Sequence, residues 1–229
     1  MIEDPPLLKV RRNFPRPEDA ATRPLRHVPT GFVVDCMDGH GALDFQIKPL
    51  DQSTCKLFGT AITCHTGPDD NLAIFAAIEV AQPGDVLMVS TDGFTGTAVT
   101  GDLLLGMARN RGIAGFVTDG LVRDIDGILP VGLPTFSRGV TPNSCVRNGP
   151  GTVGLPVTMA GVAVDAGDVV IGDRDGVVIV PRTKLAEVCE NLVAVKEAEA
   201  DLARQVRLGR DNIDSIREIL ASDRTQYID

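Results

Sequence analysis

The stretch from Thr97 to Asp124, TAVTGDLLLGMARNRGIAGFVTDGLVRD, decides the fold that we expect for this chain. Its pattern predicts a loop, a helix over Asp102–Asn110, a strand over Gly115–Thr118 and a second loop ending in Arg123-Asp124. Twenty residues separate Asp102 from Arg123. Because helix and strand form a βα-type unit, both loops can lie at one edge of a sheet, where their polar groups would share a site.

Two interpretations of Asp102, Arg123 and Asp124 are open from spacing alone. In the structural one, a helix-start acid pairs with the arginine and Asp124 caps the next turn. In the functional one, Asp124 is a metal ligand, because hard divalent cations prefer carboxylate oxygen. Arg123 would then clamp a substrate carboxylate and keto oxygen, and Asp102 would hold a water for proton transfer. The exposed amides at the helix start, including those of Leu103 and Leu104, would bind the other end of the carboxylate.

The composition argues against several classes of protein. Lys and Arg total 22 against 31 Asp and Glu, a formal charge of −9, and no Lys/Arg cluster stands out. We therefore expect no nucleic-acid partner, because such binding depends on phosphate contacts from basic residues. The cysteines are odd in number and show no CxxC spacing, so we expect reduced thiols rather than disulfides or a zinc site. They are Cys36, Cys55, Cys64, Cys145 and Cys189.

The start MIEDPPLLKVRR lacks the apolar core of a signal peptide, and no apolar run approaches the roughly 20 residues of a membrane span. These features predict a cytoplasmic protein with no membrane partner. Residues 1–16 carry three prolines and no periodic pattern, which indicates an amino-terminal arm. We expect one α/β domain over residues 17–209 and a carboxy-terminal helical extension over residues 210–229.

The remaining segments indicate a layered protein. Apolar runs predict strands over Leu57–Thr63 and Val86–Ser90, with a helix over Asn71–Val80 between them. An apolar segment and strand are expected over Ile128–Phe136, and residues 138–156 show no clear period. Three short strands, Val157–Val164, Asp168–Ile171 and Gly176–Val180, precede a long helix from Thr183 to about Leu208. This order departs from regular βαβ alternation and favours a layered β/β/α sandwich over a doubly wound sheet.

Four blocks in order resemble the RraA-like family: AQPGDVLMVS, TGDLLLGMARNRGIAGFVTDGLVRD, GLPTFSRG and AGDVVIGDRDGVVIVP. The resemblance covers about residues 28–210. That family includes class II pyruvate aldolases acting on 4-hydroxy-4-methyl-2-oxoglutarate and 4-carboxy-4-hydroxy-2-oxoadipate. The resemblance implies a β/β/α sandwich of swivelling-domain type, assembled as a homotrimer or hexamer with sites between subunits.

The resemblance also implies roles for individual residues. Mg²⁺ or Mn²⁺ would sit by Asp124, and Arg123 would bind the pyruvate part of a small keto acid. Gly101, Leu103 and Leu104 would supply the backbone of that substrate site, and Asp102 would position a catalytic water. Glu199, on the carboxy-terminal helix of a neighbouring subunit, would contact metal-bound water. The implied reactions are retro-aldol release of pyruvate and decarboxylation of oxaloacetate.

One departure from the aldolase pattern bears on the activity. That pattern has a further acid after the Arg-Asp pair and two intervening residues, where this chain has Gly127, and Asp126 falls one residue early. Relatives without this acid include RraA, an inhibitor of RNA degradation that binds ribonuclease E. The alternative to a metal-dependent lyase is therefore a non-catalytic regulator that acts by protein binding.

Overall fold

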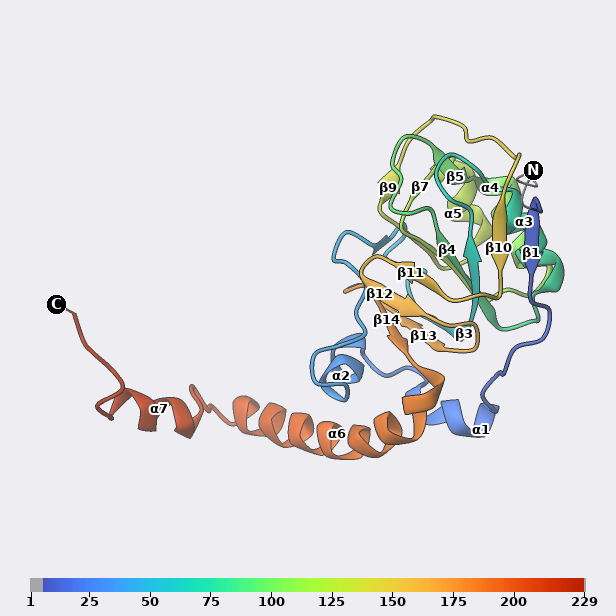
Figure 1. Cartoon of the computed structure of the whole chain (residues 1–229). Helices are drawn as coiled ribbons and strands as arrows, with labels where there is room; N and C mark the ends of the chain where they lie inside the picture. The colour runs from blue at the N-terminus through green and yellow to red at the C-terminus, as the bar shows by residue number, and fades with distance from the viewer. Residues whose placement is uncertain (1–5, 229) are drawn as a thin grey trace, which may run out of the picture.

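The computed structural model describes residues 6–228, so residues 1–5 of the expected arm and Asp229 lie outside it. Figure 1 shows a body of sheet and helices from which one helical segment, α6 and α7, extends outward. The helices and 3-10 turns are α1 (Asp19–Thr22), η1 (Arg23–Leu25), α2 (Thr30–Asp35), α3 (Leu72–Val80), α4 (Asp102–Asn110), α5 (Ile125–Val131), η2 (Arg182–Lys184), α6 (Leu185–Arg207) and α7 (Asp214–Leu220).

A mixed sheet of nine strands forms the centre, in the order β1-β10-β3-β4-β6-β8-β2, with β13 and β14 continuing from β3. Strands β3, β4, β6 and β8 run parallel, so their carboxyl ends lie at one edge. The nine strands are β1 (Leu8–Val10), β2 (Lys48–Pro49), β3 (Leu57–His65), β4 (Asp85–Ser90), β6 (Gly115–Thr118), β8 (Thr135–Ser137), β10 (Gly151–Val153), β13 (Val169–Gly172) and β14 (Val177–Val180).

Side chains of β4 show how the layers are separated. Leu87 and Val89 point into a core shared with α3, α4 and α5, whereas Val86 and Met88 point into a core shared with the β11–β14 region. A third apolar cluster lies between β13, β14 and the helices α2 and α6. The continuous apolar run of β4 is thus explained by burial on both faces.

A small parallel sheet extends the edge where the main parallel strands end. Its members are β5 (Ala98–Thr100), β7 (Leu121–Val122) and β9 (Gly139–Val140), in the order β5-β7-β9. Each follows a main strand along the chain, since β5 comes after β4, β7 after β6 and β9 after β8. The chain therefore crosses the edge three times and places α4 directly after β5 and α5 after β7.

Several elements agree with the sequence-based predictions and others do not. The helix Asp102–Asn110 and the strand Gly115–Thr118 have the predicted bounds. The segments expected to be loops on either side also contain the short strands β5 and β7. These strands are too short to show a period, and they form by pairing within the small sheet β5-β7-β9. The prediction of a single strand over Val157–Val164 is wrong. This segment forms a hairpin of β11 (Val157–Met159) and β12 (Val162–Val164) that turns at Ala160 and Gly161, both with positive φ.

The apolar segment starting at Ile128 lies in α5, despite a proline in its last turn, and the strand expected there is shorter than predicted. Of the segment predicted as an arm, residues 8–10 form β1, which pairs in parallel with β10.

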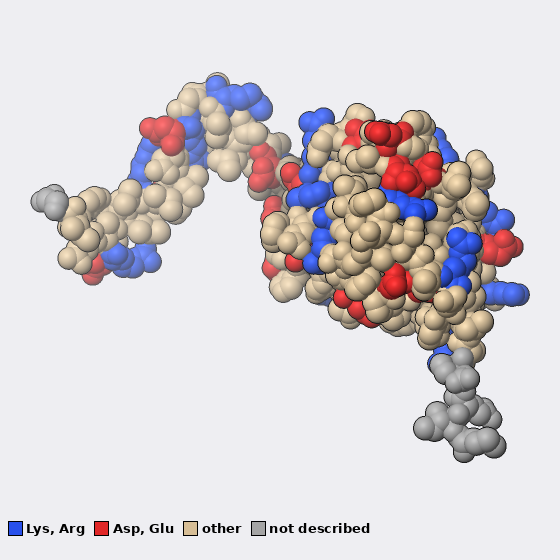
Figure 2. Space-filling view, turned by 90° about the horizontal axis from the view of Figure 1, so that it is seen from above, with Lys and Arg blue, Asp and Glu red and all other residues tan. Residues whose placement is uncertain are grey.

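At the carboxy-terminal end, the outer part of α6 and all of α7 stand away from the body, as Figure 2 also shows. Basic and acidic side chains are interspersed on the face seen in Figure 2. No helix among residues 6–228 is long and apolar enough to span a membrane.

Candidate functional site

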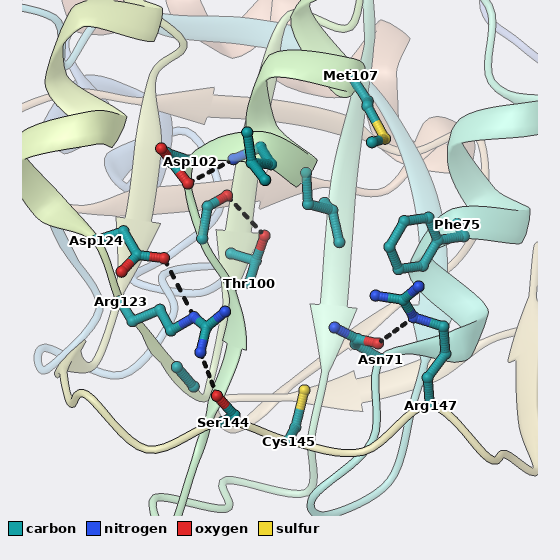
Figure 3. A pocket seen from close by; sticks show the side chains of 14 residues that line it. Asn71, Phe75, Thr100, Asp102, Met107, Arg123, Asp124, Ser144, Cys145 and Arg147 are labelled. Atoms are coloured by element: carbon teal, nitrogen blue, oxygen red, sulfur yellow. Dashed lines mark hydrogen bonds and ion pairs between the residues drawn. The ribbon is translucent and has the colours of Figure 1, made fainter.

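A pocket of about 280 Å³ opens where β5 and β7 end. Its walls come from the start of α4, the Arg123-Asp124 turn, the first turns of α3 and the loop over residues 144–147 (Figure 3). The predicted site residues Asp102, Arg123 and Asp124 all line this pocket. The placement follows from topology, because neighbouring parallel strands deliver both predicted loops to one edge.

The two loops are joined at backbone level. Arg123 N–H donates to the carbonyl oxygen of Thr100 at 3.0 Å. A Cβ built on Gly101 would lie 2.6 Å from Asp124 Oδ2 and 3.3 Å from Arg123 Cγ. Gly101 has an ordinary extended conformation, so the absence of a side chain matters here through close approach. Glycine at this position lets the Arg-Asp pair lie directly against the β5–α4 junction.

Asp124 is held in an unusual backbone conformation. Its φ and ψ of 60° and 46° are left-handed, and it forms the amino-terminal cap position of α5. Asp and Asn tolerate this conformation better than most residues, and such strain concentrates at functional sites. The Asp124 carboxylate lies 3.1 Å from Arg123 Nε, with both side chains less than half exposed. This ion pair orients the guanidinium, which also donates to the hydroxyl of Ser144.

Asp102 is the first residue of α4, and its carboxylate faces α5. Asp102 Oδ1 accepts a hydrogen bond from the N–H of Leu103 at 2.7 Å, so this amide is already partly engaged. The other oxygen lies 2.5 Å from the position that a Cβ on Gly127 would occupy. The Asp102 carboxylate thus fills the space beside residue 127, and a side chain there would displace it.

The pairing expected in the structural interpretation is wrong: Arg123 pairs with Asp124, whereas Asp102 accepts from the helix amide of Leu103. Asp124 does occupy the cap position of α5, but its side chain makes no capping hydrogen bond there. Gly101, Leu103 and Leu104 also line the pocket, as the predicted substrate site requires. Glu199 does not line the pocket of its own chain and lies exposed on the outer half of α6. That residue was assigned to a neighbouring subunit, so its role stays a prediction.

The donor set fits a cation that keeps most of its water. No group of three or more His, Cys, Asp or Glu side chains able to hold a metal is found among residues 6–228. Mg²⁺ is commonly held by one or two carboxylates, with water and substrate as its other ligands. Asp124 offers one such carboxylate: only Oδ2 contacts Arg123, and no other described residue hydrogen-bonds to Oδ1. The residues present are therefore compatible with Mg²⁺ or Mn²⁺ at Asp124.

Sequence reasoning missed the far wall of the pocket. Asn71, Phe75, Ser144 and Arg147 line it, and the last two come from the aperiodic segment 138–156. No sequence signal identified them, because their position depends on how that segment crosses the start of α3.

Cys145 also lines the pocket, where partial burial raises the pKa of its thiol. Since no histidine lines the pocket, Cys145 is poorly suited to act as a nucleophile.

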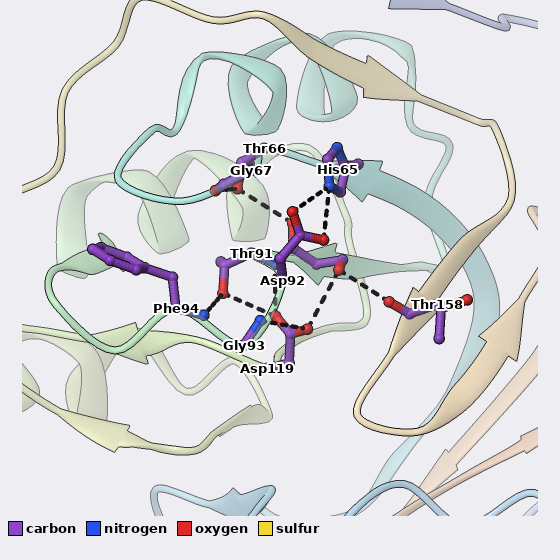
Figure 4. A network of polar contacts seen from close by, with 10 residues as sticks. His65, Thr66, Gly67, Thr91, Asp92, Gly93, Phe94, Asp119 and Thr158 are labelled. Carbon is purple, nitrogen blue, oxygen red and sulfur yellow. Dashed lines mark hydrogen bonds and ion pairs between the residues drawn. The ribbon is translucent and has the colours of Figure 1, made fainter.

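A buried aspartate supports the edge that carries the site. The Asp119 carboxylate accepts hydrogen bonds from Thr91 N–H at 2.7 Å, from the Thr91 hydroxyl at 3.0 Å and from Gly93 N–H at 3.2 Å (Figure 4). It therefore ties the turn between β6 and β7 to the loop between β4 and β5. Nearby, His65 Nε2 lies 3.0 Å from an Asp92 carboxylate oxygen, which closes the same loop over β3. These contacts fix the relative position of the segments that lead into β5 and β7, the strands after which Asp102 and Arg123 follow.

Known proteins resemble this chain over most of its length. A protein of Halalkalibacterium halodurans named "Putative 4-hydroxy-4-methyl-2-oxoglutarate aldolase" is 36% identical over 195 residues, which are 85% of this chain and 91% of that protein. A Streptomyces coelicolor structure, described as an unusual member of the RNase ES inhibitor RraA protein family, is 30% identical with a TM-score of 0.73. It covers 83% of this chain and 99% of its own.

The RNA-processing inhibitor RraA from Thermus thermophilus is 28% identical with a TM-score of 0.62, covering 68% of this chain and 93% of its own. These similarities confirm the predicted layered α/β fold with its carboxy-terminal helix. The model of the RraA-like family, described as Aldolase/RraA, matches residues 30–179. All the residues that line the pocket described above fall within this range, and the chain belongs to the RraA-like family.

Proposed function

We propose that this chain is a divalent-metal-dependent lyase that releases pyruvate from a 4-hydroxy-2-oxo acid by retro-aldol cleavage. One observation carries the proposal: Asp102, Arg123 and Asp124 line a single pocket at the ends of two neighbouring parallel strands. The named aldolase relative, at 36% identity, supports the same activity. Decarboxylation of oxaloacetate belongs to the proposal because it forms the same pyruvate enolate.

The reaction requires groups that stabilise the negative charge of the enolate. When C3–C4 of the substrate breaks, its electron pair becomes the C2–C3 double bond of the enolate, and charge develops on the C2 oxygen. Arg123 is oriented by Asp124 and Ser144 so that its remaining N–H groups can donate to this oxygen and to the C1 carboxylate. A Mg²⁺ or Mn²⁺ ion held by Asp124, with Glu199 of a neighbouring copy, would add Lewis-acid polarisation of the same keto group.

The protons also have to be accounted for. The C4 hydroxyl proton leaves to a base as its O–H electron pair becomes the C4 carbonyl, and a proton returns to C3 of the enolate. We assign to Asp102 the water that carries these protons, and its position in the pocket with Arg123 and Asp124 supports this role. The backbone of Gly101, Leu103 and Leu104 would bind the C1 carboxylate at the start of α4.

We also propose that the chain works as a homotrimer or hexamer. The outer part of α6 and all of α7 stand away from the body in Figure 1, and exposed apolar residues recur along them, including Leu202 and Val206 in α6 and Leu220 in α7. A neighbouring copy would cover this surface and bring Glu199 to a second pocket. The five unpaired cysteines agree with a cytoplasmic location, which stays a prediction.

The test is pyruvate release from 4-hydroxy-4-methyl-2-oxoglutarate and from oxaloacetate, with Mg²⁺ and with a chelator. We expect activity that the chelator removes and that Arg123→Ala or Asp124→Ala lowers by about 100-fold or more. Arg174→Ala serves as the control, because Arg174 is exposed on a turn outside the pocket. Lack of activity on both substrates would instead favour a non-catalytic regulator that binds ribonuclease E-type machinery, as the RraA structures suggest for their own proteins.

A further inference from the structure

The amino-terminal segment over residues 7–16, which we call the strap, lies against the part of the chain that completes the pocket. Figure 1 shows its strand β1 beside β10. No strap residue lines the pocket, and the proposed reaction gives the strap no role. The far wall of the pocket includes Ser144, whose hydroxyl accepts a hydrogen bond from the Arg123 guanidinium. The way in which this wall is held therefore bears on where the guanidinium lies.

Part of the far wall is formed by residues 144–149, which we call the far-wall loop. One side of this loop is bonded to the segment that leads into α3. Val146 N–H donates to the Asp69 carbonyl oxygen at 2.9 Å. Gly149 N–H donates to the buried Asp70 carboxylate at 2.8 Å. These bonds leave the end of the loop, where the chain enters β10, to other contacts.

The strap covers that end of the far-wall loop. Gly151 N–H, at the start of β10, donates to the Leu7 carbonyl oxygen at 2.9 Å. A Cβ built on Gly149 would lie 2.9 Å from the same oxygen and 3.2 Å from Leu72 Cδ2. The end of the loop is thus enclosed between the strap and α3, with no room for a side chain.

Strand β10 pairs more extensively with the strap than with β3. All three β10 residues pair with β1, from Leu8↔Gly151 to Val10↔Val153. Only Thr152 and Val153 pair with β3. Among residues 6–228, the β10 residue nearest the far-wall loop, Gly151, therefore has the strap as its only strand partner. A strand of three residues is stable only when it is paired, so the strap stabilises the point at which the loop ends.

The strap is itself fixed to the body beyond β1. Arg11 N–H donates to a carbonyl oxygen of β10 at 2.9 Å. Phe14 is 8% exposed and packs in the core shared with α3 and α4. A Cβ on Gly167 would overlap the Pro15 carbonyl oxygen, so glycine at this position lets the strap backbone lie directly on the body. The contacts run along the strap from the far-wall loop to the core.

We propose that the strap is a positioning element for the pocket. Through β10 it holds the far-wall loop against α3, and the loop in turn keeps Ser144 at the Arg123 guanidinium. Elements with few buried contacts open locally, so loosening of the strap does not require unfolding of the main sheet. The position of the loop follows from these contacts for any ligand, whereas the effect of the strap on turnover rests on the proposed function.

Hydrogen exchange measured residue by residue tests the inference without a substrate. Arg11→Pro removes the N–H that bonds β10, Arg11→Ala keeps it, and Arg12→Pro is the matched control because Arg12 N–H makes no backbone hydrogen bond among residues 6–228. The bonds of the Val146 and Gly149 amides do not involve the strap. We expect both amides to exchange about two- to tenfold faster in Arg11→Pro only, while the amides of β4 keep their wild-type rates.

A second pair of variants avoids proline. Leu8 is partly buried against the core, whereas its neighbour Leu7 is 62% exposed. Leu8→Ala should therefore speed exchange in the far-wall loop, and Leu7→Ala should not. Unchanged exchange of the loop in both Arg11→Pro and Leu8→Ala overturns the inference. Exchange that rises equally in β4 also overturns it, because the strap would then stabilise the whole body rather than the pocket wall.

Pyruvate release from oxaloacetate with Mg²⁺ gives the functional readout. Arg11→Pro should lower kcat/KM about two- to tenfold, whereas Arg11→Ala and Arg12→Pro should match wild type. Faster loop exchange with unchanged kcat/KM overturns the role of the strap at the pocket. Faster loop exchange in a chain that releases no pyruvate supports the strap and refutes only the lyase. Turnover in a chain whose loop exchange does not respond to the variants refutes only the strap.

Discussion

Replacing Gly127 by alanine tests whether the place of the Asp102 carboxylate matters for the reaction. The new Cβ would lie 2.5 Å from Asp102 Oδ2 and 2.8 Å from Asp102 Cγ. Ordinary Cβ contacts begin at 3.4 Å, so the carboxylate has to move by about 0.9 Å, the difference between the two distances. The Asp102 side chain is partly exposed and can rotate away from residue 127, so the fold can accept the alanine.

Misplacement of a reacting group by about 1 Å can lower a rate by roughly 100-fold, so we expect kcat for pyruvate release to fall about 10- to 100-fold. Stability should not fall, because alanine in a helix is favoured over glycine by up to about 1 kcal/mol. The assay couples pyruvate to lactate dehydrogenase and follows NADH absorbance, while a thermal melt gives Tm.

The matched control is Gly106→Ala in α4, where a Cβ would meet no atom within 4 Å. It should raise Tm slightly and leave kcat unchanged. A Gly127→Ala enzyme with wild-type kcat would show that the Asp102 position is irrelevant to the chemistry. A large drop in Tm would show that Asp102 is held too firmly to move, which contradicts the steric reasoning.

Two further predictions concern stability. Arg16→Ala should lower the free energy of unfolding by about 3 kcal/mol in urea titrations. The change removes the only cation paired, among residues 6–228, with the buried Asp85 carboxylate, which Arg16 contacts at 2.8 and 3.1 Å, and leaves it the Gln82 N–H. Arg23→Ala, which breaks an exposed pair with Asp19, should change it by less than about 1 kcal/mol, and equal effects of the two variants would refute this argument. Burial alone would raise the pKa of Asp173, but hydrogen bonds from Thr30 and Asp175 and the charge of Lys56 outweigh it and lower that pKa. The resulting stabilisation is present above the unfolded pKa near 4 and lost as pH falls through the folded value. Asp173→Asn should therefore weaken the fold at pH 7 and flatten the loss of stability below about pH 4; an unchanged acid-unfolding curve would count against this assignment.

Local signals accounted for the elements that bear the reactive groups. The amphipathic period of Asp102–Asn110 and the apolar run of Gly115–Thr118 predicted a helix and a strand that the structure reproduces. Hence Asp102 and the Arg123-Asp124 pair could be assigned to the two ends of one βα unit. Such predictions succeed because side-chain periodicity along one element depends only on which face of that element is buried.

Only the tertiary structure decided how the pocket is completed. Ser144 and Arg147 belong to a segment with no period, and they reach the pocket because that segment pairs with the start of α3. The contact between Gly127 and the Asp102 carboxylate, and the left-handed backbone of Asp124, arise where α4, α5 and β7 meet. Contacts between elements distant in sequence depend on the packing of the whole sheet edge, and no local pattern encodes them.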